Sequence, residues 1–371
     1  MKLSTLWLLG FCLLASGCSD DPAGPQINLP AISHFTGTSV PVDTTGHVVN
    51  YQSLVIGADS HPRVAYEWTE TVSIDYRGTV KYARYDGGRW LTETVSPEHE
   101  DAGSPELLID PGGTPVMFYE SRISSYHAEL KYARRLENGQ WESETVDSEG
   151  YVGTWSSAAF DGIGRLHVAY FAGYPNYDLR YARYADGIWE KELVDSEGET
   201  GYEVQLLIDS ANEPYLGYGT TTTWKTRFAS RTGSQWVIET LPGSYFGHRF
   251  AMSTNGTPKP IFALWSGSLV LAAHNGSSWT VEPIDDHGAT GVGHSGLHQD
   301  SNSTLLVVYV RDSVQRIAWK HDLWNSQSID GLFGDGVDGP SVINNDGGVS
   351  VLFTLGEQQL YYGTIQPVYT P

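Results

Sequence analysis

The sequence predicts an all-β protein that folds as a seven-bladed β-propeller of four-stranded blades. Three observations support this prediction. A unit of four strand-like segments recurs along the chain, a tryptophan marks each recurrence, and the last unit lacks one strand that the N-terminus can supply. A composition with 41 Gly, 18 Pro and 12% aromatic residues suits many short strands joined by tight turns. Beyond the N-terminal apolar run, we find no helical periodicity of useful length.

The recurring unit begins with an apolar run that ends in Asp, as in "PELLID" (105–110). A Gly- or Asn-containing turn leads to a second segment, "PVMFY" (115–119), and the third and fourth segments read "LKYAR" (130–134) and "WESETVD" (141–147). These segments are rich in Val, Ile, Tyr and Trp and are bounded by turn residues, which are signals of β-strands. Each unit therefore predicts one four-stranded sheet.

The tryptophan that opens the fourth segment sets the period of the repeat. The spacings fit a four-stranded propeller blade, whose known repeats run about 40 to 50 residues. The tryptophans are Trp90, Trp141, Trp189, Trp236, Trp279 and Trp324. First strands are expected near Ser53, Pro105, Ser157, Val204, His248, Ser295 and Pro340. This count gives seven blades, of which the first four have the clearest repeats.

The seventh unit stops after its third segment, "QLYYGTI" (359–365). Its missing fourth strand is found at the other end of the chain, where "HFTGTSVPVDTTG" (34–46) matches "QWESETVDSEG" (140–150) in its aromatic opening and its closing Val-Asp. We expect the N-terminal strand to complete the last blade, because an open ring would expose two sheet edges. The predicted propeller domain spans residues 32–371.

The N-terminus has the layout of a signal peptide. Lys2 precedes an apolar run from Leu3 to Leu14, which is too short for a permanent membrane span. "LLASGC" (13–18) resembles the bacterial lipobox, although Ala15 stands where that pattern prefers Leu. The resemblance implies a signal peptide over 1–17, lipid attachment at Cys18 and a flexible tether over 18–31. A chance Cys after an apolar run is the alternative.

This layout predicts an extracytoplasmic protein of the bacterial cell envelope, anchored by lipid. Ser19, by resemblance to sorting rules, permits the outer membrane if the host is a diderm. Cys12 leaves with the signal peptide, so no disulfide and no thiolate site is expected in the mature chain. The net charge of −22 argues against nucleic acid as a partner and against membrane contact other than through the lipid. We expect a monomer that needs no cofactor.

The repeat "KYARYDGGRW" (81–90) raises the question of family. Residues 34–365 resemble the sialidase-like superfamily of bacterial β-propellers, many of them lipoproteins with degenerate Asp-box-like repeats. Sialidases carry Ser-x-Asp-x-Gly-x-x-Trp at this hairpin and an Arg-Ile-Pro motif, whereas this chain has only truncated forms such as "HNGSSW" (274–279). The resemblance therefore implies the fold but not sialidase activity. We interpret the Trp as inter-blade packing and the Asp/Asn-Gly pair as a left-handed turn.

The candidate site lies on the face that carries the connections from fourth to first and from second to third strands. The aligned positions at this mouth are Tyr51, Ser104, Trp155, Glu203, Gly247, His294 and Asp338, and two residues further in are Ser53, Glu106, Ser157, Gln205, Arg249, Gly296 and Pro340. They differ from blade to blade and include aromatic and ionisable residues, as a sugar site would require. The proposed ligand-binding residues are Tyr51, Glu106, Trp155, Glu203, Gln205, His248, Arg249 and His294. Solvated polarity at loop ends is the alternative.

His298 is unusual because its equivalents in the other blades are apolar. A hydrogen-bonded core histidine is one interpretation, because burying the ring unpaired is costly. With His248 and His294 it could also serve as a base or metal ligand. The turn aspartates follow no D-x-D-x-D pattern, and no metal site is predicted.

Two classes of function fit these observations. The first is an anchored module that binds a glycan or another exposed polymer at one central site, because divergent positions argue against identical sites between blades. The second is a carbohydrate-active enzyme. It could be a glycoside hydrolase with paired carboxylates such as Glu106 and Glu203, or a polysaccharide lyase with a His/Tyr/Arg set. A purely structural or protein-interaction propeller is a third possibility.

Overall fold

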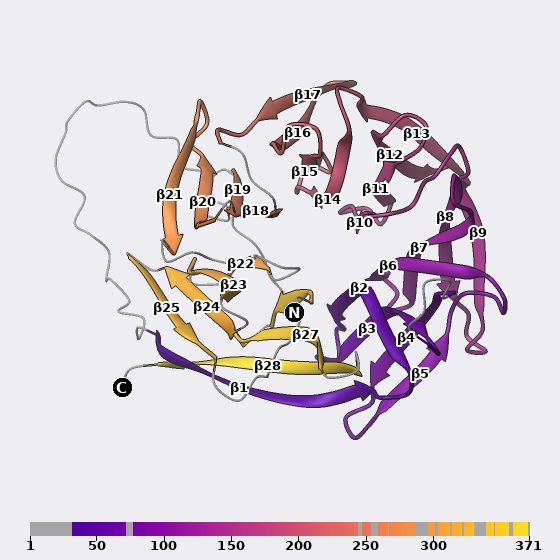
Figure 1. Cartoon of the computed structure of the whole chain (residues 1–371), viewed down its shortest axis with the longest axis horizontal. Helices are drawn as coiled ribbons and strands as arrows, with labels where there is room; N and C mark the ends of the chain where they lie inside the picture. The colour runs from indigo at the N-terminus through magenta and orange to yellow at the C-terminus, as the bar shows by residue number, and fades with distance from the viewer. Residues whose placement is uncertain are drawn as a thin grey trace, which may run out of the picture.

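The computed structural model describes residues 32–71, 77–243, 247–253, 259–265, 267–285, 296–300, 303–311, 314–320, 323–329, 339–344, 346–355 and 359–369. The described strands form seven four-stranded sheets arranged around a central channel (Figure 1). The protein is a seven-bladed β-propeller, as the sequence predicts. Cys18 and the tether lie outside the described residues. None of the described segments contains a helix long and apolar enough to cross a membrane.

The blades follow the chain in order. Blade 1 contains β2 (His47–Ile56), β3 (Pro62–Thr69), β4 (Thr79–Tyr85) and β5 (Trp90–Thr94). Blade 2 contains β6 (Asp101–Ile109), β7 (Pro115–Ser124), β8 (His127–Arg135) and β9 (Trp141–Asp147). Blade 3 contains β10 (Ser157–Phe160), β11 (Leu166–Ala172), β12 (Asp178–Ala185) and β13 (Ile188–Asp195). Blade 4 contains β14 (Thr200–Ile208), β15 (Pro214–Thr220), β16 (Thr226–Thr232) and β17 (Gln235–Thr240).

The remaining blades are built in the same way. Blade 5 contains β18 (Gly247–Met252), β19 (Pro260–Trp265), β20 (Leu269–His274) and β21 (Trp279–Asp285). Blade 6 contains β22 (Leu297–Gln299), β23 (Leu305–Arg311), β24 (Val314–Lys320) and β25 (Trp324–Ser328). Blade 7 contains β26 (Ser341–Ile343), β27 (Val349–Leu355), β28 (Gln359–Tyr369) and, from the N-terminal part of the chain, β1 (Ile32–Asp43).

Strand β1 closes the ring. It pairs antiparallel with β28 from His34, opposite Val368, to Asp43, opposite Leu360. The prediction that the N-terminal strand completes the last blade is therefore confirmed. The third strand of this blade runs four residues beyond the predicted 359–365, and β1 covers this extension.

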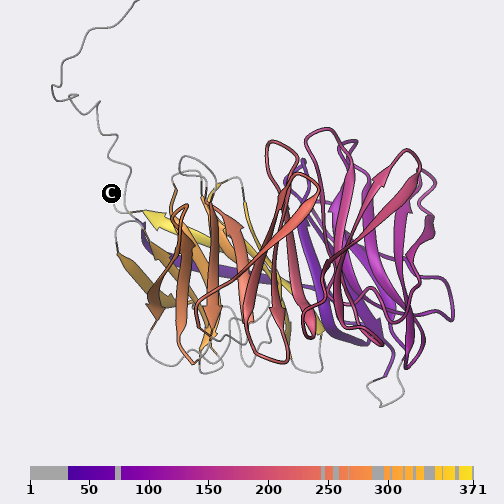
Figure 2. The same cartoon turned by 90° about the horizontal axis from the view of Figure 1, so that it is seen from above.

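The strands run between two faces of the ring, as the side view shows (Figure 2). One face carries the connections from second to third and from fourth to first strands, and we call it the loop face. The other carries the connections from first to second and from third to fourth strands, and we call it the turn face. The first strand of each blade borders the channel (Figure 1).

The hydrophobic core is divided among the blade interfaces. The described residues form seven buried clusters, and each joins two neighbouring blades. In the cluster between blades 2 and 3, for example, Phe118 packs with Tyr170 and Val168. Because each sheet alternates between two apolar faces, every blade needs a neighbour on both sides, which a closed ring supplies.

The repeated tryptophans pack between blades, as expected. Trp141 lies edge-on to Tyr82 of the preceding blade with ring centroids 5.5 Å apart, and Trp236 lies in the same way against Tyr181 at 5.4 Å. Each indole N–H also donates to a glutamate on the fourth strand of the preceding blade. These bonds join Trp141 to Glu93, Trp189 to Glu144, Trp236 to Glu192, Trp279 to Glu239 and Trp324 to Glu282, at 2.8 to 3.3 Å.

The seam between blades 7 and 1 lacks this bond. In β1 the position of the glutamate is taken by Val40, and the Trp90 Nε1 atom is buried with no hydrogen-bond partner among the described residues. On the other side of blade 7, Gln327 stands at the glutamate position. Its side chain exchanges two hydrogen bonds with the backbone of Phe35, at 3.1 and 2.9 Å.

The closing Val-Asp of the fourth strand has a second role between blades. A buried tyrosine on the second strand of the next blade donates its hydroxyl hydrogen bond to this aspartate, at 2.7 to 2.8 Å. We call these contacts the tyrosine–aspartate pairs. They are Tyr66–Asp43, Tyr170–Asp147, Tyr218–Asp195 and Tyr309–Asp285. Each carboxylate also contacts a basic side chain, such as Arg227 beside Asp195 at 2.7 Å.

Blade 2 lacks such a pair. Its tyrosine, Tyr119, faces Ser96, because the fourth strand of blade 1 ends in Val-Ser instead of Val-Asp. The Tyr119 hydroxyl is buried, and no described group makes a hydrogen bond of normal geometry with it, although Ser143 lies nearby. One blade interface therefore provides a natural control for the others.

Candidate functional site

A cavity of about 190 Å³ opens at the loop-face mouth of the channel. It is formed by the innermost strands of blades 1 to 5 and by Pro340 of blade 7. Five of the residues proposed from sequence line it: Glu106, Trp155, Glu203, Gln205 and Arg249. The other lining residues are Gln52, Ser104, Pro105, Ser156, Ser157, Val204 and Pro340. Sequence reasoning gave Gln52 and Ser156 no role.

A repeated backbone feature sets the rim of this cavity. Ser104, Trp155 and Glu203 occupy the same position in blades 2, 3 and 4, and all three have left-handed backbone, with φ of 51°, 48° and 48°. In blades 2 and 4 this residue lies in a β-bulge, where the pairing register shifts between Gly103 and Glu106 and between Tyr202 and Gln205. Non-glycine residues with positive φ cost free energy and tend to gather at binding sites.

The rim side chains have distinct environments. Trp155 packs against Tyr202, with centroids 4.2 Å apart, and against Phe171 at 5.2 Å, which holds the indole at the cavity wall. The Glu203 carboxylate lies 3.7 Å from Nη1 of Arg249, and that guanidinium also donates to the carbonyl of His248 at 2.7 Å. The cavity therefore combines an aromatic ring with an acid and a base that contact each other.

The positions two residues further in share a structural task. The Ser53 hydroxyl accepts from the backbone N–H of Leu107, the Ser157 hydroxyl from that of Leu206, and the Gln205 carbonyl oxygen from that of Phe250. Each bond satisfies an N–H on the channel edge of the next blade, which would otherwise lack a partner. The requirement at this position is an acceptor oxygen, which explains part of the diversity that we interpreted as functional.

Glu106 meets the same requirement with an ionisable group. Its carboxylate accepts from Ser53 Oγ at 3.1 Å and from the backbone N–H of Ala158. The side chain faces the channel and is surrounded by three blades. Burial raises the pKa of Glu106 to about 7, and the two hydrogen bonds only partly oppose this shift. At neutral pH this carboxyl is near the midpoint of its titration.

His248 does not line the cavity. It precedes Arg249 on β18, and successive residues on a strand point to opposite faces, so only one of the two can face the channel. His248 is 2% exposed and packs beside Phe262, with centroids 6.1 Å apart. Burial lowers the pKa of His248 to about 4, so the ring is neutral at physiological pH. The expectation that it lines one pocket with Trp155 and Glu203 therefore fails.

The other sequence candidates divide into two groups. His294 lies outside the described residues, as does the side chain of Tyr51, whose backbone belongs to β2. His298 is described, and its Nε2 lies 2.9 Å from the hydroxyl of Ser341 in blade 7. Burial lowers the pKa of His298 to about 4. This arrangement agrees with the interpretation of a hydrogen-bonded core histidine.

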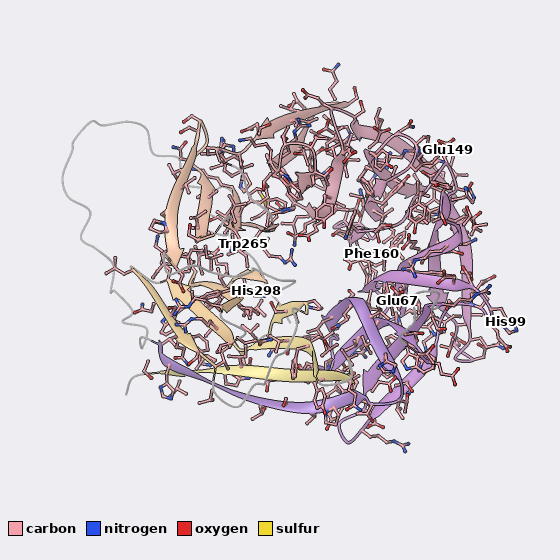
Figure 3. The ribbon with its side chains drawn as sticks, in the orientation of Figure 1. Glu67, His99, Glu149, Phe160, Trp265 and His298 are labelled. Atoms are coloured by element: carbon pink, nitrogen blue, oxygen red, sulfur yellow. The ribbon has the colours of Figure 1, made fainter. Side chains whose placement is uncertain are left out.

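An ion-pair network supports the rim beneath Ser104 and Thr154. Arg122 donates two bonds to Glu67, at 2.8 and 3.1 Å, and a third to Glu120 at 3.2 Å. Glu120 in turn accepts from the hydroxyls of Ser104 and Thr154, at 3.2 and 3.0 Å. Glu67 lies towards the inner side of the ring, whereas His99 lies at its outer margin (Figure 3).

Sequence reasoning missed this network, although both blades carry the signal Tyr-Glu at the end of the second strand. The network also explains two arginines that we considered for a sialidase-like triad. Arg122 is held by carboxylates within the fold, and Arg311 pairs with Asp285 at 2.7 Å. Among the described residues, no group of three or more His, Cys, Asp and Glu side chains is arranged to hold a metal ion.

Comparison with known proteins identifies the fold but no family. No family model matches the chain, and no curated protein matches it. Among solved structures, a streptogramin B lyase has a TM-score of 0.58 at 12% identity and covers 90% of this chain and 98% of its own. The α-L-arabinanase of Penicillium chrysogenum, complexed with arabinobiose, has 0.57 at 12%, with 90% and 98% covered. A polysaccharide lyase described as an ulvan lyase has 0.57 at 11%, with 89% and 96% covered.

Identities this low establish a shared β-propeller architecture and nothing more specific. Membership of the sialidase-like superfamily stays a prediction from the repeat sequence.

Proposed function

We propose that this protein binds a glycan, or another exposed polymer, through one terminal or protruding unit inserted into the loop-face cavity. The observation that carries the proposal is the convergence of Trp155, Glu203 and Arg249, from three different blades, on one cavity over the channel. The volume of about 190 Å³ is below the roughly 300–1,000 Å³ of pockets that enclose drug-sized ligands. One sugar unit suits it better than a chain buried along its length.

The chemistry of the lining fits a sugar. An indole wall offers an apolar surface to the C–H face of a pyranose, and the Glu203 carboxylate and Arg249 guanidinium offer an acceptor and donors to hydroxyl groups. Two further polar atoms, Gln52 Oε1 and Ser156 Oγ, are buried at the cavity lining and have no hydrogen-bond partner among the described residues. Such unsatisfied atoms are costly unless water or a ligand pairs with them.

The comparisons add only general support. An arabinanase and an ulvan lyase are built on the same architecture, so propellers of this shape can act on polysaccharides. Shared architecture does not transfer their substrates to this chain.

The direct test is a glycan array probed with residues 32–371, followed by titration calorimetry with the best glycan. Trp155→Ala and Glu203→Gln should each weaken binding by about 5- to 150-fold, equivalent to about 1 to 3 kcal/mol. Thermal stability should barely change, since both side chains lie above the apolar layers. Leu323→Ala, at a turn-face residue that is 79% exposed, is the control. Absence of any glycan ligand, or unchanged affinity in both variants, would leave a structural or protein-interaction propeller.

A second candidate function, glycoside hydrolysis, is favoured by one observation. Glu106 has its pKa raised to about 7 and shares the cavity with Glu203. A carboxyl that keeps its proton near neutral pH can act as a general acid, while a second carboxylate serves as base or nucleophile. In this role Glu106→Gln should reduce turnover of the array-selected glycan at least 100-fold while its binding is retained. A glycan that binds but is not cleaved over several days would exclude this candidate.

We also propose that lipid on Cys18 anchors the protein outside the cytoplasm of a bacterial cell. The support is the apolar run followed by small residues and a cysteine at the cleavage point. Cys18→Ala should move the protein from the membrane fraction to the soluble or precursor pool. Normal processing with an unchanged membrane fraction would refute lipid attachment at this residue.

A further inference from the structure

A second pocket, of about 540 Å³, lies on the turn face between blades 2 and 3. Its walls come from the third and fourth strands of both blades and from the β10–β11 turn. Phe160 forms the inner wall and also borders the channel, which agrees with its position at the inner side of the ring in Figure 3. The pocket is therefore separate from the loop-face cavity, which lies at the other end of the channel.

The repeat explains why a pocket opens at this interface. The last residue of the third strand pairs with the tryptophan of the fourth strand, and in blades 2 and 4 it is Arg135 and Arg231. Arg135 extends to Glu93 of the preceding blade, with the shorter contact 2.7 Å, and Arg231 extends to Glu192 in the same way. Lys320 in blade 6 makes the equivalent contact with Glu282. In these blades a basic side chain fills the space between tryptophan and glutamate.

Blade 3 breaks this pattern. Tyr184 occupies the basic position opposite Trp189. Glu144 keeps the hydrogen bond from Trp189 Nε1, at 2.8 Å, but forms no ion pair among the described residues. Blade 1 also has a tyrosine here, Tyr85, but its interface has Val40 in place of the acid. Among the six tryptophan positions, only the interface between blades 2 and 3 combines an aromatic pair with an unneutralised carboxylate.

The pocket walls combine aromatic surface with both donors and acceptors. The Tyr184 and Trp189 rings lie 5.0 Å apart, and Tyr132 lies 5.8 Å from Trp189. Glu144 supplies an acceptor, and Arg165, whose side chain is 38% exposed, supplies donors beside its bond to Asp161. The ionisable lining is balanced, with Glu142 and Glu144 against Arg134 and Arg165. On a protein with a net charge of −22, such balance favours an uncharged ligand.

We propose that this pocket is a second saccharide site, which takes one neutral sugar residue. The aromatic rings accept the apolar face of the sugar, while the carboxylate and guanidinium bind its hydroxyl groups. The site arises from one substitution in the repeat, Tyr for a basic residue, and so occurs at one interface of the ring instead of at all of them. This corrects the sequence-based argument that divergence between blades disfavours inter-blade sites.

The variant Tyr184→Arg provides the test, because it restores the side chain that fills the equivalent space in blades 2 and 4. The arginine should pair with Glu144, so the fold should be kept and the thermal midpoint should not fall. The probes are the methyl glycosides of glucose, galactose, mannose, rhamnose and fucose, measured by saturation-transfer NMR and by titration against residues 32–371. We expect at least one to bind with a Kd on the order of 1 mM. Tyr184→Arg should weaken it at least tenfold, and Glu144→Gln should weaken it several-fold.

Three results would overturn the proposal. No glycoside binds the unmodified protein below roughly 10 mM, or Tyr184→Arg binds as well as the unmodified protein, or binding is lost in Trp155→Ala but kept in Tyr184→Arg. The last result would assign the sugar to the loop-face cavity. Loss in Tyr184→Arg with binding kept in Trp155→Ala would support this site whatever the fate of the central one. Leu323→Ala is again the neutral control.

Discussion

The tyrosine–aspartate pairs should contribute measurably to the stability of the ring, and the chain contains its own control. Tyr218→Phe removes a hydroxyl that donates at 2.8 Å to Asp195, a carboxylate only 5% exposed. A hydrogen bond to a charged group contributes about 1.5–3 kcal/mol. Because Arg227 still contacts this carboxylate at 2.7 Å, we expect a loss at the lower end of that range. Tyr119→Phe removes a hydroxyl that has no such partner and should change stability by less than about 0.5 kcal/mol.

The assay is equilibrium unfolding of residues 32–371 in urea, followed by tryptophan fluorescence and by circular dichroism. Coincident transitions are needed before a free energy of unfolding is assigned, because a repeat ring can unfold in stages. If Tyr119→Phe proved as damaging as Tyr218→Phe, the hydrogen bond would not be the source of the loss. Tighter packing around the smaller ring would then have to explain both.

A gain-of-function variant tests the same reasoning in the opposite direction. Ser96→Asp places a carboxylate where the other blades have one, facing the Tyr119 hydroxyl. Lys131 is opposite Tyr119 in the sheet, as Arg227 is opposite Tyr218, and can supply the cation. We expect Ser96→Asp to be tolerated or stabilising in the natural chain and destabilising when combined with Tyr119→Phe. Equal effects in the two backgrounds would contradict the proposed contact.

Three further predictions concern the ring as a whole. Burial alone would raise the pKa of Asp147 and of Asp195, but hydrogen bonds from neighbouring side chains and backbone outweigh it and lower both; this stabilisation is therefore present above about pH 4 and lost as the pH falls through the folded pKa values, so the urea midpoint should drop in acid more for the natural chain than for Asp195→Asn. Val40→Glu should supply the missing acceptor for Trp90 and raise stability by about 0.5–1 kcal/mol, a gain that should vanish in a Trp90→Phe background. Removing residues 32–46 should cause aggregation or a large fall in the thermal midpoint, and removing 19–29 should be nearly neutral; similar melting of the two truncations would argue against closure by β1.

Much of the fold could be predicted from sequence because the signals are local and repeated. A tryptophan every 43 to 51 residues and a missing last strand determine the number of blades and the closure. The register was harder to predict. The first strands of blades 1, 2 and 4 begin four to six residues before the predicted positions, because a bulge lets pairing continue past the rim. Such a bulge leaves only a weak trace in the sequence of a single chain.

The candidate site could be predicted in outline but not in its division of labour. Ser53, Ser157 and Gln205 differ as letters, and only the structure shows that each supplies an acceptor oxygen to the next blade. The position of His248 was predictable in principle, because adjacent residues on one strand cannot both face the channel. Tyr184 was visible in the alignment as an exception to Arg135 and Arg231, but its significance depends on a glutamate one blade away.

The left-handed residue at the mouth has a consequence for how this protein could change its ligand. The bulge is held by the backbone pairing around it and, in blade 2, by the carboxylates beneath Ser104. Trp155 and Glu203 are therefore exchangeable, because their side chains project into the cavity while the fold depends on other atoms. Their positive φ makes glycine or asparagine at either position comfortable and β-branched residues costly. A library randomised at these two residues should consist mainly of folded propellers with different ligand preferences, so that new recognition could arise without loss of the scaffold.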